Sequence, residues 1–252
     1  MDINQALIDL GVSDATLTSQ ERQALDSDGY VVLEGVIDSA WLEGLRGTFE
    51  ALYEREGASA GSEVHQEAGT RRLSDLVNKD ELFDRVYTHP RVLAAVAHVL
   101  QRPFKLSSLN AREAQAGTGL QALHADWGDA QKHGDAFHVV NSLWLLDDYL
   151  PDNGSTRVVP GTHRLGAPAD HLDDPKAAHP DQVVLTAPAG TVVVINSHLW
   201  HGGTTNTSGK PRRVCHSYYT AREHPQQLDQ AAYIRKRVYD RLSPAARWVL
   251  DV

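Results

Sequence analysis

The sequence predicts a mainly β protein with a strand-rich centre, residues 104–220, between helical segments at 1–103 and 221–252. Short apolar runs follow one another through the centre, separated by turn signals such as Asn153-Gly154 and Pro160-Gly161 and without long helical patterns between them. This pattern is typical of an antiparallel sandwich or jelly roll. No stretch has the composition of an interdomain linker, so we expect a single domain over residues 1–252.

The first helical signals lie close to the N-terminus. Thr18 or Ser19 can cap a short helix over Leu17–Asp28, and Gly29 can end it. The apolar run Tyr30–Leu33 that follows is suited to a brief strand.

Two further helices are expected before the strand-rich centre. Asp38 and Ser39 can cap a longer helix, in which apolar residues recur at three- and four-residue spacing from Trp41 to Tyr53. The segment Arg55–Arg72 is rich in Gly, Ala, Ser and Glu and lacks periodicity, which predicts a mobile loop. Pro90 suits the first position of a helix that runs to Leu100.

Seven strands are expected in the centre, and the chain then returns to helical character over Gln227–Val252, which we expect to pack outside the sheets. The expected strands are Phe104–Arg112, Leu120–Asp126, Phe137–Leu146, Ser155–Val159, Gln182–Thr186, Thr191–Asn196 and Arg212–Thr220.

Composition narrows the class of function. The 252 residues carry a net charge of -9, which argues against a nucleic-acid partner because such partners require a basic face. The single cysteine, Cys215, excludes an intramolecular disulfide or a Cys-rich zinc site. Apolar runs are too short to span a membrane, and residues 1–21 lack the Lys or Arg of a secretory signal. We therefore expect a cytoplasmic protein without a membrane partner; the oligomeric state is not indicated.

Histidine is the abundant metal-binding side chain, with 13 copies. A His-x-Asp pair at a strand end places both side chains on one face, where one metal ion can bind both. With 33 acidic residues present, such pairs also arise by chance, so their number does not discriminate. The His-x-acid pairs are His65–Glu67, His124–Asp126, His133–Asp135 and His171–Asp173.

Sequence context favours one pair. His124 and Asp126 end an expected strand, whereas the other pairs fall in expected loops, where surface exposure is the usual state. A third ligand would come from His198 or His201, which follow the strand Thr191–Asn196. Two histidines and one carboxylate form the arrangement that leaves open positions on Fe(II). The later Pro211-Arg212-Arg213 returns an arginine to the same end of the sheet, and its planar fork suits a carboxylate.

These motifs, in this order, resemble the phytanoyl-CoA dioxygenase family over roughly Asp26 to the C-terminus. The segments that carry the resemblance are Leu123–Asp126, Asp152–Gly154 with Val158–His163, and Trp200–Asn206 with Pro211-Arg212. The resemblance implies a double-stranded β-helix (a cupin-like jelly roll). It also implies Fe(II), with 2-oxoglutarate as cosubstrate and O2 as oxidant, in an enzyme that oxidises a small-molecule substrate and releases succinate and CO2.

The resemblance also implies site residues. His124, Asp126 and His201 match the iron ligands, and Arg212 matches the arginine that binds the distal carboxylate of 2-oxoglutarate. Related halogenases carry a small residue where this chain has Asp126, so the carboxylate favours hydroxylation of an unactivated C–H bond.

Looser matches add three polar residues. Asn110 and Ser142 occupy strand positions at which relatives contact the cosubstrate, and Gln121 can point inward before the His-x-Asp turn. For all three, ordinary strand polarity is the alternative interpretation. Gly203 departs from the pattern, because some relatives place a serine there that binds the cosubstrate; Thr204 is a substitute.

The walls of a substrate site are expected from Trp127, Trp144 and the segments 55–72 and 163–181. Trp144 shares its strand face with Ser142, and its alternative role is packing in the core. The two long segments can act as lids or lie in solvent.

Two other functions fit part of the pattern. A cupin-like module could hold a metal and ligand without turnover, and a His2Asp site also suits Zn2+ in a hydrolase. The zinc hydrolase leaves Arg212 without a role, which favours the dioxygenase.

Overall fold

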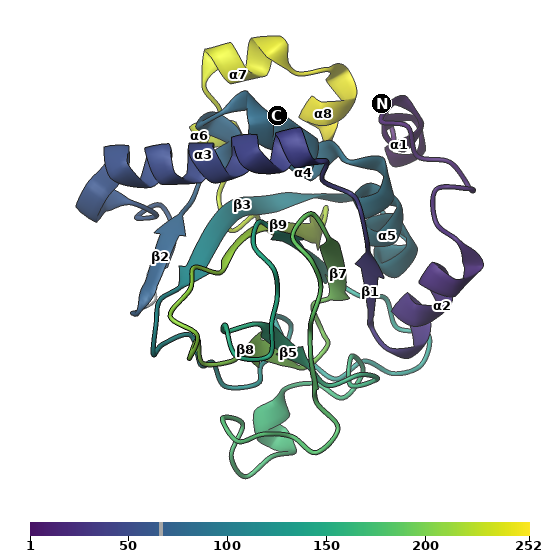
Figure 1. Ribbon diagram of the computed structural model, residues 1–252. Coiled ribbons are helices and arrows are strands. Elements are labelled where there is room, and N and C mark those ends of the chain that lie inside the picture. The colour runs from purple at the N-terminus through teal and green to yellow at the C-terminus, as the bar shows by residue number, and fades with distance from the viewer. Residues whose placement is uncertain (66–67) are drawn as a thin grey trace.

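The computed structural model describes residues 1–65 and 68–252, and its strands form two antiparallel sheets. The large sheet has the order β1-β7-β4-β9-β3-β2 and the small sheet the order β6-β5-β8. The small sheet lies on one side of the large one and the long helices lie on the other (Figure 1). This is the predicted jelly roll. The strands are β1 (Tyr30–Leu33), β2 (Thr70–Leu73), β3 (Phe104–Ala114), β4 (Val139–Leu145), β5 (Thr156–Val158), β6 (Val183–Val184), β7 (Val192–Asn196), β8 (His201–Gly203) and β9 (Arg213–Ala221).

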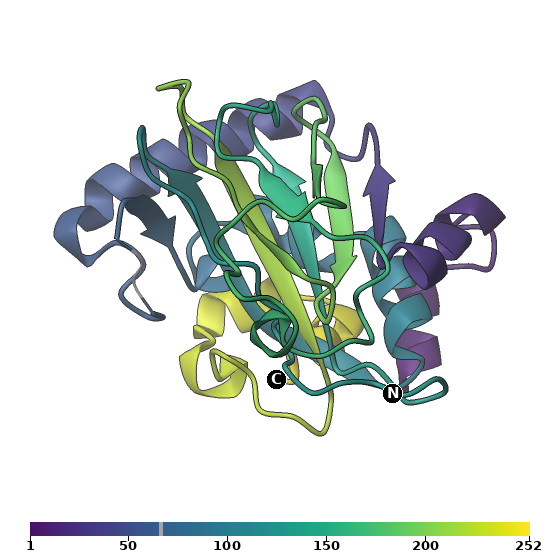
Figure 2. The same ribbon diagram turned by 90° about the horizontal axis from the view of Figure 1, so that it is seen from below.

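Helices from both ends of the chain flank the large sheet, as Figure 2 shows from below. The α-helices are α1 (Ile3–Asp9), α2 (Ser19–Ser27), α3 (Ser39–Glu56), α4 (Asp84–Thr88), α5 (Pro90–Leu100), α6 (Gln230–Tyr233), α7 (Lys236–Arg241) and α8 (Pro244–Leu250). Short 3-10 turns are η1 (Gly57–Ser59), η2 (Leu76–Asn78), η3 (Glu81–Phe83) and η4 (Pro168–Asp170). None of the described helices combines the length and apolar character needed to cross a bilayer.

The large sheet is buried on both faces, as strand β4 illustrates. Val140 and Trp144 pack in the core beneath the helices, whereas Leu143 and Leu145 pack in the core between the two sheets. Side chains alternate between the faces of a strand, so an almost continuous apolar run supplies both cores.

The predicted helix ends follow from local hydrogen bonds. Thr18 caps α2 in a reciprocal box with Glu21, and the Asp38 carboxylate accepts from the backbone N–H of Trp41 at the start of α3. Pro90 opens α5, as expected from a residue that lacks a backbone N–H. These three helices confirm the sequence predictions to within a few residues.

Strand β3 contains a bulge that decides which residues face the small sheet. Leu106 pairs with Tyr219 and Ser108 pairs with Tyr218, so Ser107 is the extra residue. Before the bulge, Phe104 and Leu106 face the helical core; after it, Leu109 and Ala111 do. The bulge thus exchanges odd and even positions between the two faces of the strand.

The strand predicted over Leu120–Asp126 is wrong. This segment is irregular and makes a single bridge, between His124 and His201. Its backbone hydrogen bonds go to several partners, including Gly203 O from Gln121 N and Pro175 O from Leu123 N, so no ladder continues along it.

The loop predicted over Arg55–Arg72 is also partly wrong. Helix α3 extends to Glu56, η1 follows, and β2 (Thr70–Leu73) pairs with β3 at the sheet edge; residues 66–67 lie outside the described part of the chain. Strand β8 was not predicted, because its Gly202-Gly203 pair has low strand propensity. Its strand conformation depends on pairing with β5. Helices α1 and α4 were not predicted either.

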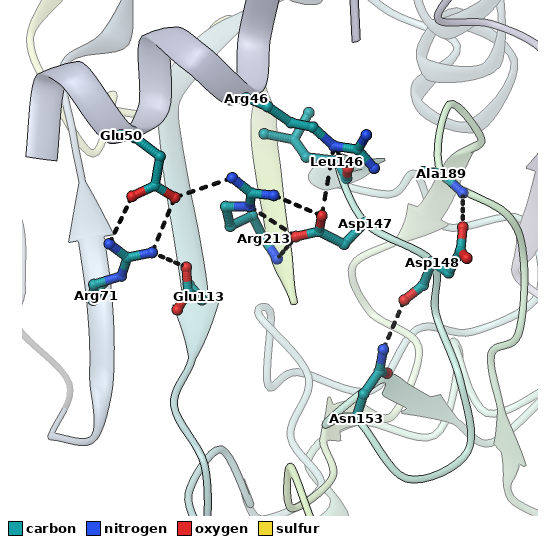
Figure 3. Close-up of polar contacts among 10 residues, drawn as sticks. All are labelled: Arg46, Glu50, Arg71, Glu113, Leu146, Asp147, Asp148, Asn153, Ala189 and Arg213. Carbon is teal, nitrogen blue, oxygen red and sulfur yellow. Dashed lines mark hydrogen bonds and ion pairs between the residues drawn. The ribbon is translucent and has the colours of Figure 1, made fainter. Parts of the chain in front are cut away.

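An ionic network joins α3 to the sheet (Figure 3). Arg71 on β2 donates to the carboxylates of Glu50 at 2.9 Å and of Glu113 on β3. Arg213 on β9 donates to Glu50 at 3.0 Å and makes three bonds of 2.8 Å to the Asp147 carboxylate. The hydrogen bond from Arg71 holds the pKa of Glu50 below its usual value. The network fixes the start of β9 against α3.

We expect Arg213→Met to lower the free energy of unfolding by about 1–3 kcal/mol, because the Asp147 carboxylate, which is only 15% exposed, loses both of its bonds from the Arg213 guanidinium. Urea unfolding measures the change. Lys236→Met is the control: its pair with Asp240 is exposed, so its effect should stay within about 0.5 kcal/mol. Equal effects of the two substitutions would contradict this role of the network.

Candidate active site

The segment before the His-x-Asp pair is joined to β8 by a pair of backbone hydrogen bonds. The N–H groups of His124 and His201 each donate to the other's carbonyl at 2.9 Å. The N–H of Asp126 donates to Ser197 O at 2.8 Å, just before β8. Residues 77 positions apart in sequence are therefore held side by side by the backbone itself.

Three side chains converge at this bridge. The Nε2 atoms of His124 and of His201 each lie 3.8 Å from Asp126 Oδ1. One ligand atom from each residue lies within 4.8 Å of the others. Ligand atoms at 2.0–2.2 Å from one ion can be up to about 4 Å apart, so small adjustments bring all three onto a metal.

Backbone carbonyls orient both imidazole rings. His124 Nδ1 lies 3.0 Å from Ala122 O, and His201 Nδ1 lies 2.8 Å from Leu199 O. A carbonyl accepts only, so each Nδ1 carries the proton and each Nε2 presents its lone pair to the shared space. Burial, assisted by the neighbouring His124, lowers the pKa of His201, which favours the neutral ring that metal binding requires.

The three side chains border a cavity of about 360 Å3 between the two sheets. His201 lies deep, with 10% of its side chain exposed, whereas His124 at 40% lies at the rim. Among the described residues that line the cavity, polar groups dominate, and Leu143 is the one aliphatic side chain. The lining residues are Arg72, Ser108, Asn110, Arg112, Gln121, His124, Asp126, Asn141, Leu143, Thr156, His201, Gly202, Arg212, His216, Tyr218 and Gln227.

Arg212 lines this cavity, and strand alternation explains why. The next residue, Arg213, is bound to Glu50 on the α3 side of the sheet, so the side chain of Arg212 points to the opposite side, toward the cavity. The Arg212 guanidinium is buried at 1% exposure and donates to Tyr149 Oη at 3.2 Å and to Gly154 O. The turn that carries Gly154 is held by Asn153, which donates to Asp148 O at 2.7 Å (Figure 3).

Comparison with known proteins assigns the family. The model for Phytanoyl-CoA dioxygenase (PhyH) matches residues 25–214. The chain belongs to this family. It is accordingly a dioxygenase that depends on Fe(II), 2-oxoglutarate and O2.

Individual relatives agree with this assignment. Protein Rv1501 of Mycobacterium tuberculosis is 31% identical over 238 residues, which cover 91% of this chain and 84% of the relative. Dioxygenase af480 of Aspergillus fumigatus is 27% identical over 260 residues, covering 95% and 79%. The crystal structure of HygX from Streptomyces hygroscopicus with nickel and 2-oxoglutarate bound superposes with a TM-score of 0.66 at 21% identity, covering 83% of this chain and 89% of HygX. At that identity the structural likeness concerns the fold, which is the jelly roll.

Two of the looser site predictions for this dioxygenase fall in the cavity. Gln121 lines it, and its Oε1 accepts from the backbone N–H of Gly203 at 2.9 Å. Asn110 lines it as well, because the bulge in β3 turns even-numbered residues after Ser107 toward the small sheet. Gly203 stands where some relatives have a serine, and there is a steric reason for the glycine: a Cβ at this position would come within 2.4 Å of Gly119 O.

Three other predicted site residues do not line the cavity: Ser142, Trp144 and Trp127. Ser142 is fully buried on the opposite face of β4, where its hydroxyl bonds Ser217. Trp144 lies on that same face, donates to Ser142 Oγ at 2.9 Å and packs edge-on against Trp41 in the helical core. Ser142 and Trp144 thus share a face of β4 as predicted, and that face meets the helical core, which was the alternative interpretation for Trp144; Asn141 and Leu143 face the cavity.

Trp127 lies beside the cavity in a cluster of histidine rings. Its ring stacks on His138 at 4.1 Å and contacts His224. His198, the alternative third ligand, is buried in the same cluster and accepts from the backbone N–H of His138 at 3.0 Å. Burial lowers the pKa of His198 to about 3, which keeps its ring neutral. The structure thus places His201, and not His198, beside His124.

Sequence reasoning missed other polar residues of the cavity. Arg72 and Arg112 are paired across β2 and β3, and both line the cavity. His216 on β9 lies between Asn110 and Leu143 in the sheet. Burial and the nearby Arg112 hold the pKa of His216 well below its usual value. Alternation along β9 from Arg212 would have identified His216, whereas Arg72 depended on a strand that was not predicted.

Arg157 on β5 holds the irregular segment that carries His124 and Asp126. Its buried guanidinium donates to Gln121 O at 3.0 Å, to Pro175 O at 3.2 Å and to Ala177 O at 2.7 Å. These carbonyls belong to segments that have no ladder of their own. Arg157 therefore links the 120–126 segment to the long 163–181 segment, whose role as a lid stays a prediction.

We expect Arg157→Met to lower the free energy of unfolding by about 2–4 kcal/mol, because buried carbonyls lose their donor. Urea unfolding measures this, and Ni2+ titration should show weaker binding because the ligand segment loosens. Arg22→Met is the control, since Arg22 makes an exposed bond to Asp14 O and should change stability by less than about 0.5 kcal/mol. Unchanged stability and Ni2+ affinity in Arg157→Met would contradict this role.

Proposed function

We propose that this dioxygenase binds Fe(II) through His124, Asp126 and His201, binds 2-oxoglutarate through Arg212, and hydroxylates an unactivated C–H bond of a small organic molecule. On this proposal residues 1–252 act as one catalytic domain. The observation that carries it is the convergence of two imidazole Nε2 atoms and one carboxylate oxygen on a cavity that also holds a buried guanidinium.

The donor set fits Fe(II). Two neutral imidazoles and one carboxylate occupy one side of an ion and leave the remaining positions open for cosubstrate and O2. When bound, the iron supplies the activation of O2 with electrons from 2-oxoglutarate. The protein's part is orientation: the carbonyls of Ala122 and Leu199 fix the rings before the metal arrives.

The remaining polar residues have positioning roles in this proposal. The planar guanidinium of Arg212 offers two parallel N–H donors to the distal carboxylate of 2-oxoglutarate. Gln121 and Asn110 add polar side chains to the same cavity. The Asp126 carboxylate supports hydroxylation, because it fills the coordination position that a halide would otherwise take.

We expect His124→Ala, Asp126→Ala and His201→Ala each to reduce Fe(II)-dependent succinate formation from 2-oxoglutarate by at least about 100-fold, since removal of a mere outer partner of a ligand already costs 10–100-fold. Metal analysis of the same variants should show the loss of stoichiometric iron.

The matched control is His133→Ala. His133 belongs to an exposed His-x-Asp pair outside the cavity and should leave both readouts unchanged. Equal activity in the wild type and the three ligand variants would refute the assignment. Tight stoichiometric zinc without any response to 2-oxoglutarate would favour the hydrolase instead, and binding of metal and 2-oxoglutarate without turnover would favour the non-catalytic module.

We expect Arg212→Met to raise the Kd of 2-oxoglutarate about 10- to 100-fold, because it removes charge-assisted hydrogen bonds. Calorimetry on the Ni2+-loaded protein measures this without turnover. Lys210→Met removes the same charge from an exposed position two residues away and should leave the Kd unchanged. A wild-type Kd in Arg212→Met would place the distal carboxylate elsewhere.

A further inference from the structure

The cavity has a second polar region on β3, β4 and β9, apart from Arg212. Ser108, Tyr218 and Asn141 form one row across these strands, and Asn110, His216 and Leu143 form the next. His216 is four residues beyond Arg212, so its Cα lies about 13 Å along β9 from that of Arg212.

A residue from outside the sheets completes the region. The Gln227 side chain lines the cavity, and its Oε1 accepts from Ser108 Oγ at 2.6 Å and from Asn110 Nδ2 at 3.3 Å. Gln227 follows β9 in the C-terminal segment, beyond the residues 25–214 that match the family.

The bulge in β3 is what holds Gln227 there. The extra residue, Ser107, accepts from the backbone N–H of Gln227 through its hydroxyl at 2.7 Å and from that of Leu228 through its carbonyl at 3.1 Å. Gln226 donates to Leu106 O at 2.7 Å on the other side of the bulge. One irregularity thus turns Ser108 and Asn110 toward the cavity and docks the segment that supplies Gln227.

Two acceptors in this region need a hydrogen-bond donor. Asn110 is 6% exposed, and its Oδ1 is buried without a partner among the described residues; the same holds for Oδ1 of Asn141. Buried polar atoms in folded proteins are almost always satisfied, so these oxygens indicate a ligand. Ionised 2-oxoglutarate carries acceptor oxygens only and cannot satisfy them, whereas a substrate that carries a hydrogen-bond donor can.

The substrate group that fits is neutral. Ser108, Asn110, Asn141 and Gln227 are all uncharged, and an ammonium group removed from water without a paired anion is strongly disfavoured. A hydroxyl both donates to an amide oxygen and accepts from an amide N–H2 group, which matches this set. With Leu143 as the one aliphatic side chain in the described lining, a hydrocarbon would leave these polar groups unpaired.

We propose that Gln227, with Ser108, Asn110 and Asn141, forms the substrate-recognition subsite of this dioxygenase and selects a hydroxyl-rich small molecule over an apolar one. The inference rests on the proposed function, because the substrate is placed relative to the metal ligands and Arg212.

The test uses the full chain loaded with Ni2+ and 2-oxoglutarate, a state in which binding is measured without turnover. Ligand-observed NMR compares hydroxylated probes, myo-inositol and methyl glucopyranoside, with apolar six-membered-ring probes, benzene and toluene. We expect the hydroxylated probes to bind and the apolar probes to bind at least fivefold more weakly. Gln227→Leu and Asn141→Leu should each weaken the hydroxylated probes about five- to tenfold, the effect of one lost hydrogen bond.

Gln23→Leu, which adds the same apolar group at an exposed position on α2, is the control and should bind like the wild type. Apolar probes that bind as well as hydroxylated ones, or wild-type affinity in both variants, would overturn the inference. Failure of the wild type to bind Ni2+ or 2-oxoglutarate would instead refute the proposed function. If the wild type binds Ni2+ and 2-oxoglutarate but not the hydroxylated probes, the recognition subsite alone is refuted.

Discussion

The candidate active site depends on one short piece of backbone pairing, the bridge between His124 and His201. Each residue donates its N–H to the other's carbonyl at 2.9 Å, and this reciprocal pair joins an irregular segment to β8. Two side chains that leave neighbouring strands at a bridge necessarily lie close together. The third side chain of the cluster, Asp126, is then placed by its own backbone bond to Ser197. The convergence of the three side chains is thus a consequence of main-chain hydrogen bonds, and they need only small adjustments to meet at one metal ion, as the proposed function requires.

A second irregularity shapes the rest of the cavity. Without the extra residue at Ser107, strand alternation would turn Asn110 toward the helical core and Leu109 toward the cavity. The bulge reverses this and leaves the Ser107 hydroxyl and carbonyl available to dock Gln227 and Leu228. Both irregular features border the cavity, whereas the regular strands β4 and β7 serve chiefly to build the two cores. Interruptions of the ladder thus place part of the cavity lining, while the regular ladder of β4 and β9 supplies Asn141 and His216.

The sequence was informative where local chemistry decides structure. Helices α2, α3 and α5 begin where Thr18, Asp38 and Pro90 signal them, because caps act within one helical turn. It was misleading where partners are distant. Ser142 and Trp144 share a face of β4 as predicted, but both faces of that strand are buried, so apolar residues cannot indicate which face meets the cavity. Trp144 therefore lies in the helical core, although Asn141 and Leu143 on the same strand line the cavity.

The sequence alone determined the fold class and the family, since both follow from the order of strands, turns and motifs along the chain. It also indicated His124, Asp126, His201 and Arg212, which short motifs distinguish from the other histidines and arginines. The tertiary structure added the reason why His198 is not at the cavity, since its ring is held by the backbone of His138, and only the tertiary structure brought Gln227 into the cavity. The physical reason is that these placements depend on hydrogen bonds between segments far apart in the chain, and on a bulge that no local periodicity reveals.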